Sequence, residues 1–147
     1  MTICGIFVWG ISMDRIKFCM IILLVSFVTI VGGAFAASPP AAPTPLSPGT
    51  SSEPGHEIST LTPTLQWSVV SGADYYALAI SKYPYGSSNI VYNPQQVYGN
   101  SIQVPNGLLI FGEKYRWNMQ AHNSAGWSPI SSTLYFSTIS SPVAAFS

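Results

Sequence analysis

The stretch Lys114–Asn123 alternates strictly between two kinds of side chain. Tyr115, Trp117, Met119 and Ala121 occupy every second position, and Arg116, Asn118, Gln120 and His122 occupy the positions between them. Successive side chains of a β-strand point to opposite faces of a sheet, so a period of two places the first set on one face and the second set on the other. The pattern predicts a strand with its apolar set in a core and its polar set facing outward.

Similar short runs continue along the chain from residue 57 onward. They are rich in Val, Ile, Thr, Tyr, Phe and Trp and are separated by Gly, Pro, Asn and Ser, as is typical of antiparallel sandwiches. No window has a sustained helical period. The predicted strands are Glu57–Leu61, Thr64–Val69, Tyr75–Ser81, Asn89–Tyr92, Ser101–Val104, Lys114–Asn123 and Ser131–Ser137. Seven short strands predict an all-β sandwich.

The same alternation predicts the core. Inward positions fall on Tyr76, Leu78 and Ile80 in the third strand and on Leu134 and Phe136 in the last. The large side chains that we expect in the core are Trp67, Tyr76, Tyr115, Trp117 and Phe136. We expect Trp67 and Trp117 to meet between the two sheets.

The N-terminal region has the order of a secretory signal peptide. The apolar run Phe18–Val31 follows charged residues that end at Lys17, and small residues come after it. Ala34 and Ala36 suit signal peptidase, so residues 1–36 are predicted to be removed. The competing hypothesis is an uncleaved membrane anchor, because the run approaches the ~20 residues that span a bilayer. Translation begins at Met1 or at Met13, and the second start would give a more compact N-region.

Residues 37–55 read ASPPAAPTPLSPGTSSEPG. Prolines remove backbone donors and fix φ, and the apolar content is too low for a core. We expect an extended, semi-rigid linker here. The remaining boundaries are a folded domain over residues 56–139 and a C-terminal tail over residues 140–147.

Composition excludes several classes of function. The net charge is zero and only 7% of residues are charged. Beyond the leader, the basic residues are Lys82, Lys114 and Arg116, too few to hold a phosphate backbone, so no nucleic acid is expected as a partner. Both cysteines, Cys4 and Cys19, lie in the leader. The folded part therefore has no disulfide, thiol nucleophile or thiolate zinc ligand.

Several segments together resemble a known family. They are Pro63–Trp67, Gly72–Ile80, Leu108–Gly112, Tyr115–Ala121, Asn123–Ser128 and Phe136–Thr138. In this order they resemble the fibronectin type III superfamily, in the divergent form found in secreted prokaryotic proteins. The resemblance implies a seven-stranded, immunoglobulin-like antiparallel sandwich with a core tryptophan at position 67. It also implies a tyrosine corner, in which the Tyr115 hydroxyl bonds to backbone between Leu108 and Gly112.

One outer sheet face is the first candidate binding surface. The polar side chains predicted to lie on it are Tyr75, Arg116, Asn118, Gln120, His122 and Tyr135. Aromatic rings beside amide and guanidinium donors suit sugar stacking or a wet protein interface. The alternative is an ordinary solvated face whose tyrosines only stabilise the sheet. Trp127, between Gly126 and Pro129, either projects from its loop as a second contact or folds back onto the core.

Residues for catalysis are scarce in the folded part. Asp74 with His56 or His122 and one of many serines would make a triad on paper, but no nucleophile-elbow motif supports it. Glu53, His56 and Glu57 are close enough in sequence to ligate a cation, yet a proline and a glycine lie between them, and solvated charges are the better interpretation. We therefore predict no enzymatic activity, no cofactor and no metal.

These observations predict an exported, non-catalytic β-sandwich that binds a protein or a polysaccharide at or outside the cell surface. The alternative is a structural spacer or a remnant of a larger secreted protein. Membrane contact is expected only through an uncleaved leader.

Overall fold

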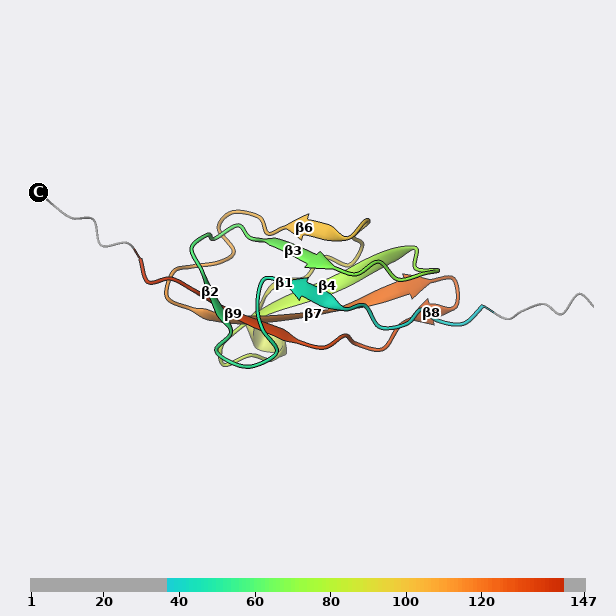
Figure 1. Cartoon of the computed structure of the whole chain (residues 1–147), viewed down its shortest axis with the longest axis horizontal. Coiled ribbons are helices and arrows are strands. Elements are labelled where there is room, and N and C mark those ends of the chain that lie inside the picture. The colour runs from blue at the N-terminus through green and yellow to red at the C-terminus, as the bar shows by residue number, and fades with distance from the viewer. Residues whose placement is uncertain (1–36, 142–147) are drawn as a thin grey trace, which may run out of the picture. The chain divides into compact units, whose positions relative to one another are not determined.

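The computed structural model describes residues 37–141, whose chain forms a β-sandwich (Figure 1). Its elements in this range are β1 (Pro45–Ser47), β2 (His56–Ile58), β3 (Thr64–Trp67), β4 (Tyr75–Lys82), the short 3-10 helix η1 (Ser87–Asn89), β5 (Ile90–Tyr92), β6 (Ser101–Gln103), β7 (Lys114–Asn123), β8 (Gly126–Trp127) and β9 (Leu134–Thr138). The predicted signal peptide, Cys4, Cys19 and residues 142–147 of the tail lie outside the described residues. Within the described range, no helix is long and apolar enough to cross a bilayer.

The strands form two sheets. The smaller sheet has the order β1-β3-β6, and the larger has the order β2-β9-β7-β4-β5, with β8 paired to β7. In Figure 1, β3 and β6 lie above β7 and β9. The predicted all-β sandwich is confirmed, with one departure from a purely antiparallel arrangement. Strand β2 runs parallel to β9, with His56 opposite Phe136.

The core lies between the inner faces of the two sheets. Strand β4 pairs with β7 along its whole length, from Tyr75 opposite His122 to Lys82 opposite Tyr115. This register places the apolar sets of both strands on the same side of the sheet. The largest fully buried side chains are Trp67, Trp117, Tyr115, Phe136, Leu65, Ile80, Leu109, Met119 and Val104. Tyr76 is also buried, and its ring lies 5.5 Å from that of Trp67.

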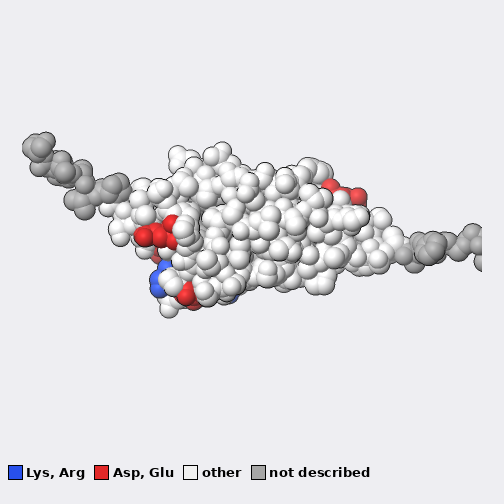
Figure 2. All heavy atoms as spheres, viewed as in Figure 1, with Lys and Arg blue, Asp and Glu red and all other residues white. Residues whose placement is uncertain are grey.

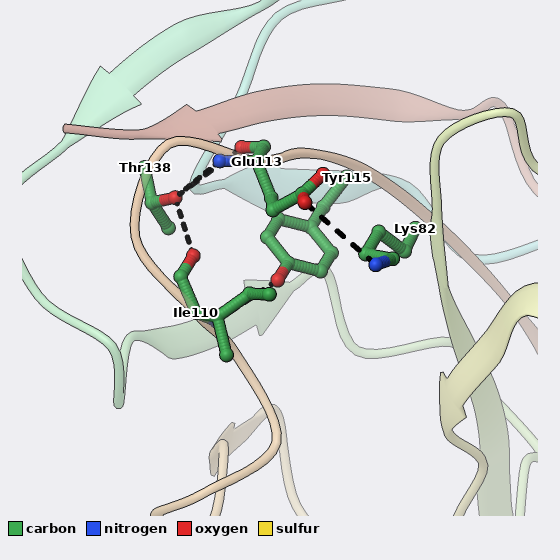
Figure 3. A network of polar contacts seen from close by, with 5 residues as sticks. All are labelled: Lys82, Ile110, Glu113, Tyr115 and Thr138. Carbon is green, nitrogen blue, oxygen red and sulfur yellow. Dashed lines mark hydrogen bonds and ion pairs between the residues drawn. The ribbon is translucent and has the colours of Figure 1, made fainter. Parts of the chain in front are cut away.

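Tyr115 makes the tyrosine-corner contact that the family resemblance implies (Figure 3). The backbone N–H of Ile110 donates to the Tyr115 hydroxyl oxygen at 3.0 Å. The Thr138 hydroxyl donates to the Ile110 carbonyl at 2.7 Å and accepts from the Glu113 N–H at 3.1 Å. Burial raises the pKa of Tyr115. These bonds attach the crossover before β7 to the end of β9.

The predicted linker over residues 37–55 requires correction. Pro40, Pro43 and Pro45 are buried, and β1 pairs with β3 at the edge of the smaller sheet. Further on, the Trp117 indole N–H donates to the Pro48 carbonyl at 2.9 Å, and Thr50 exchanges backbone hydrogen bonds with Tyr135. Proline rings bury apolar surface and proline carbonyls still accept hydrogen bonds, so this composition is compatible with an edge strand. We call residues 40–55 the strap.

Gly55 shows how closely the strap contacts β9. Its φ is +85°, which L side chains rarely adopt, and a Cβ atom at this position would overlap the carbonyl group of Tyr135. Gly55 therefore serves as a close-approach glycine in a packed segment, and the folded domain begins before the predicted boundary at residue 56.

The predicted strands differ from the observed ones mainly at the sheet edges. The first predicted strand, Glu57–Leu61, is shortened to His56–Ile58, and the last begins at Leu134 in place of Ser131. Strands β1 and β8 were not predicted. Both lie where Pro or Gly interrupts the local pattern, and their pairing depends on partners distant in sequence or across a turn.

Candidate binding surface

The outer face of the larger sheet carries the predicted binding residues. Register places Tyr75 beside His122, and it places Arg116 between Ser81 of β4 and Tyr135 of β9. Asn118 and Gln120 lie between these two positions, opposite Ala79 and Ala77. The six predicted side chains therefore share one face, and they divide into two end groups and a middle.

The first end group is the Trp127 cluster: Tyr75, Tyr98, His122 and Trp127. The Tyr75 ring stacks on the His122 ring with centroids 4.6 Å apart and 18° between planes. Trp127 meets His122 edge-on at 4.6 Å and Tyr75 at 5.7 Å. Tyr98 adds a T-shaped contact to Tyr75 at 6.4 Å. Trp127 is 41% exposed and Tyr98 is 65% exposed, so Trp127 does not fold into the core, and the cluster presents apolar surface to solvent.

Packing and hydrogen bonding position His122. Its backbone carbonyl accepts from the Asp74 N–H at 2.7 Å, which joins the start of β4 to the end of β7. Among the described residues, the His122 Nδ1 atom is buried and has no hydrogen-bond partner. Within residues 37–141, no carboxylate oxygen therefore bonds to this Nδ1 atom.

The second end group is the Arg116 cluster: Tyr83, Tyr85, Lys114, Arg116 and Tyr135. The Arg116 guanidinium lies 4.8 Å from the centre of the Tyr85 ring, and the Lys114 ammonium lies 5.6 Å from that of Tyr83. Tyr85 meets Tyr83 and Tyr135 in T-shaped contacts at 5.4 and 5.8 Å. These cation–π and aromatic contacts hold the loop after β4 against β7 and β9.

Tyr85 has a strongly perturbed hydroxyl. Burial, followed by the nearby negative charge of Glu53, raises the pKa of Tyr85 to about 12. Glu53 belongs to the strap, so the strap contributes to the environment of this end of the face. Sequence reasoning placed Glu53 with His56 and Glu57 at an alternative cation site. Within residues 37–141, no three acidic, histidine or cysteine side chains are grouped as metal ligands.

A hollow of about 100 Å³ separates the two clusters. The residues that line it on β4 and β7 include Ala77, Ala79, Asn118 and Gln120. Asn93 and Gln95 line it from the segment that borders β4, where the Pro94 carbonyl accepts from Leu78 N–H. Ile130 lines it from the segment that borders β7, where Ser131 N–H donates to the Met119 carbonyl. The hollow is a shallow, uncharged depression on the sheet face.

Hydrogen bonds organise the amides around this hollow. The Gln120 side-chain nitrogen donates to the Ser128 carbonyl at 2.7 Å, and that of Gln95 donates to the Asn93 side-chain oxygen at 2.6 Å. The middle of the face therefore presents amide groups that retain hydrogen-bonding capacity.

Charged side chains are few and lie near the two ends of the domain in the view of Figure 2. The viewed surface is almost entirely uncharged, and the Lys and Arg atoms visible on it lie near one end. Lys82, Lys114 and Arg116 are the Lys and Arg residues of the described range, and adjacent register positions place them at this end of the larger sheet. Lys82 and Glu113 approach to 3.7 Å, with both side chains 34% exposed, which contributes little to stability.

The sequence did not predict the hollow. Alternation with the inward Tyr76, Leu78 and Ile80 places Ala77 and Ala79 outward. Small outward side chains are a sequence signal for a depression on the sheet face. Asn93, Gln95 and Ile130 reach the face through loops, so periodicity contained no signal for them. Tyr85 and Tyr98 also reach the face from loops, where periodicity contains no signal for them.

Comparison with known proteins gives structural neighbours alone. No protein-family model matches the chain, and no curated protein matches it in sequence. A fibronectin type III-like protein from Clostridium thermocellum is 13% identical, with a TM-score of 0.46, covering 69% of this chain and 95% of that chain. A myokine structure is 17% identical, with a TM-score of 0.47 and coverage of 71% and 99%. A fibronectin type III domain of a human protein containing such domains is 21% identical, with a TM-score of 0.45 and coverage of 79% and 100%.

Two of these structures are fibronectin type III-like by description, at TM-scores below 0.5, and the class of this chain follows from its own elements. Its own strands define the class: a three-stranded sheet packed against a larger sheet, with a buried tryptophan and a tyrosine corner. This class of β-sandwich module does not determine a function.

Proposed function

We propose that this protein is an exported, non-catalytic β-sandwich module that binds a protein or a polysaccharide through the outer face of its larger sheet. The observation that carries the proposal is the exposure of the Trp127 cluster. Its rings contact one another and remain open to solvent, so they form a contiguous apolar patch beside polar groups. Contiguous exposed aromatic surface is typical of interaction sites, whereas isolated exposed apolar residues are common everywhere.

Rigidity of the face supports the same proposal. Tyr75, His122 and Trp127 stand on β4, β7 and β8, and two cation–π contacts tie the loop after β4 to Lys114 and Arg116. Sites on regular strands lose little conformational entropy on binding. The strap also contacts β9, where Thr50 forms an antiparallel bridge with Tyr135.

Export is proposed on the order of the leader alone: charged residues, an apolar run and then small residues. Expression of the full chain in a secretion-competent host, followed by N-terminal sequencing and intact mass, tests it. We expect a product that begins at Ala37 in the medium. A product that keeps the leader and fractionates with membranes would contradict release and support a tethered module.

Binding is tested with the full chain and extracts of cell walls or extracellular matrix. We expect retention of the wild type, and at least a tenfold weaker retention of Trp127→Ala and Tyr135→Ala. Gln66→Ala, on the outer face of the smaller sheet, is the matched control and should bind as the wild type does. Unchanged binding by Trp127→Ala and Tyr135→Ala would overturn the proposed surface.

One observation favours the alternative of a structural spacer. The two ends of the described range lie at opposite ends of the sandwich in Figure 1, an arrangement that suits modules joined end to end. A spacer would show no retention on any extract, and its aromatic variants would be indistinguishable from the wild type.

A further inference from the structure

We propose that the occupant of this face is an uncharged polysaccharide chain that lies along β7 from the Trp127 cluster to the Arg116 cluster. This inference rests on the proposed binding function and names the chemical class of its ligand. It follows from the order of apolar, polar and charged groups along the face.

The arrangement of apolar and polar groups from the centre of the face to its ends is the reverse of that in a protein interface. Stable protein interfaces have an apolar, fully desolvated centre and a polar rim, and their dominant aromatic residues lie near the centre. Here the aromatic rings lie at the two ends, and the centre holds Asn118 and Gln120 opposite two small alanines on β4. A protein partner would have to desolvate these central amides, and the exposed large apolar side chain that it could contact there is Ile130 at the border of the hollow, which disfavours it.

The hollow also disfavours a compact small molecule. Sites that enclose small molecules are usually ~300–1,000 Å³ and mostly apolar, whereas this one measures about 100 Å³ and is open on the sheet face. Ala77 and Ala79 leave a shallow floor that admits part of a ligand. Arg116 and His122, one in each cluster, are six positions apart on β7, which is about 20 Å at a rise of ~3.4 Å per residue. An extended chain of several linked rings fits this distance.

The chemistry of the middle matches hydroxyl groups. A sugar hydroxyl both donates and accepts a hydrogen bond, and an amide side chain offers both complements. Asn118, Gln120, Asn93 and Gln95 line the hollow with such groups. At the ends, Trp127, Tyr98 and Tyr83 expose ring surface on which the apolar faces of sugar rings can stack.

The charge of the face favours an uncharged polysaccharide over an acidic one. The residues that line the hollow include no charged side chain. Arg116 and Lys114 lie at one end only, and both already contact tyrosine rings. Acidic polymers and single-stranded nucleic acids are held by cations distributed along the groove, a distribution that this face lacks.

The experiment is affinity electrophoresis, in native gels, of the product secreted when the full chain is expressed. The uncharged probes are hydroxyethyl cellulose, galactomannan and xyloglucan, and the acidic probes are polygalacturonate and heparin. Proteins of a matrix extract, immobilised on beads, serve as the third probe. We expect retardation by at least one uncharged polysaccharide, weakened about tenfold in Trp127→Ala and about fivefold in Asn118→Ala.

Two control variants match these substitutions in chemistry and differ in location. Phe111 is 38% exposed, close to the 41% of Trp127, and lies outside both clusters. Gln103 presents an exposed amide on β6 of the smaller sheet. Phe111→Ala and Gln103→Ala should bind as the wild type does, and equal denaturation midpoints for all four variants would establish that each is folded.

The outcomes distinguish this inference from the proposed function. Retention by the matrix proteins or the acidic polymers, without retardation by any uncharged probe, overturns the inference and leaves the binding function standing. Failure to bind any of the three classes overturns both. Retardation that is equally weakened by the control variants and by Trp127→Ala overturns the assignment to this face.

Discussion

The outer faces of the two sheets differ in the side chains that they present to solvent. The smaller sheet shows Thr64, Gln66, Ser101 and Gln103, with Leu46 as its exposed large apolar residue. Ser47 and Gln66 bond to each other there at 3.1 Å. The larger sheet shows two aromatic clusters around an amide-lined hollow. Both faces belong to the same domain. The smaller sheet therefore shows which side chains are sufficient for an ordinary solvated face of this protein.

This internal reference favours binding over the alternative of a merely solvated face. Short hydroxyl and amide side chains are sufficient to solvate the smaller sheet. Cross-strand aromatic pairs do stabilise a sheet, by about 0.2–1 kcal/mol each. However, the Trp127 cluster gathers four rings at the end of the sheet and leaves Trp127 and Tyr98 exposed, which is more apolar surface than sheet stability requires.

The largest expected effect comes from breaking the contact between the strap and the larger sheet. In Gly55→Ala, the new Cβ overlaps the Tyr135 carbonyl. We expect a loss of about 1–2 kcal/mol from the positive φ and a further ~1–3 kcal/mol from overpacking, measured by denaturant unfolding. Gly107→Ala is the control, because its φ is +84° but a Cβ there meets nothing within 4 Å. Equal losses in the two variants would show that the strap does not pack on β9 as described.

The next effect sharpens the contrast between the faces directly. Trp127→Ala with Tyr135→Ala should reduce the affinity for the retained ligand at least tenfold, or about 1.4 kcal/mol. Gln66→Ala with Gln103→Ala should leave the affinity unchanged. Equilibrium binding by both double variants, side by side, is the measurement. A larger loss from the smaller sheet would reverse the comparison and place the site on the opposite face.

A smaller effect separates stability from binding. Tyr75 contacts three rings but is only partly buried, so Tyr75→Ala should reduce the free energy of unfolding by about 1 kcal/mol. Thr64→Ala, on the smaller sheet, should change it by less than about 0.5 kcal/mol. Thermal or denaturant unfolding measures both. A loss of several kcal/mol in Tyr75→Ala would mean that the Trp127 cluster is a structural core, which would weaken the case for binding.

The smallest effect is an alkaline loss of stability at the Arg116 cluster. Burial and Glu53 raise the pKa of Tyr85 from 10.0 to about 12, so the folded state keeps this proton when the unfolded state has lost it. The contribution is complete below pH 10 and is lost as the pH rises from 10 to 12. Unfolding free energies across this range should fall less steeply in Tyr85→Phe than in the wild type. Parallel slopes would contradict the perturbed environment of Tyr85.

Local pattern predicted the central strands well. Alternation in Lys114–Asn123 placed Tyr115 and Trp117 inward and Asn118 and Gln120 outward, because side-chain direction in a strand depends only on position. The prediction failed at the strap, where local composition suggested an unpaired spacer. Strand β1 is stabilised by pairing with β3 and by burial of proline rings. These contacts join segments distant in sequence, so a short sequence window cannot reveal them.

The sequence by itself determined the sandwich, the inward core and the sharing of one face by Tyr75, His122, Arg116 and Tyr135, since each follows from a period of two and from turn residues. Tertiary structure alone decided that Trp127 and Tyr98 join Tyr75, that the strap packs on β9, and that an uncharged hollow lies between two clusters. The physical reason is that strand direction is a local property, whereas loop approach and strand register depend on packing between segments far apart in the chain.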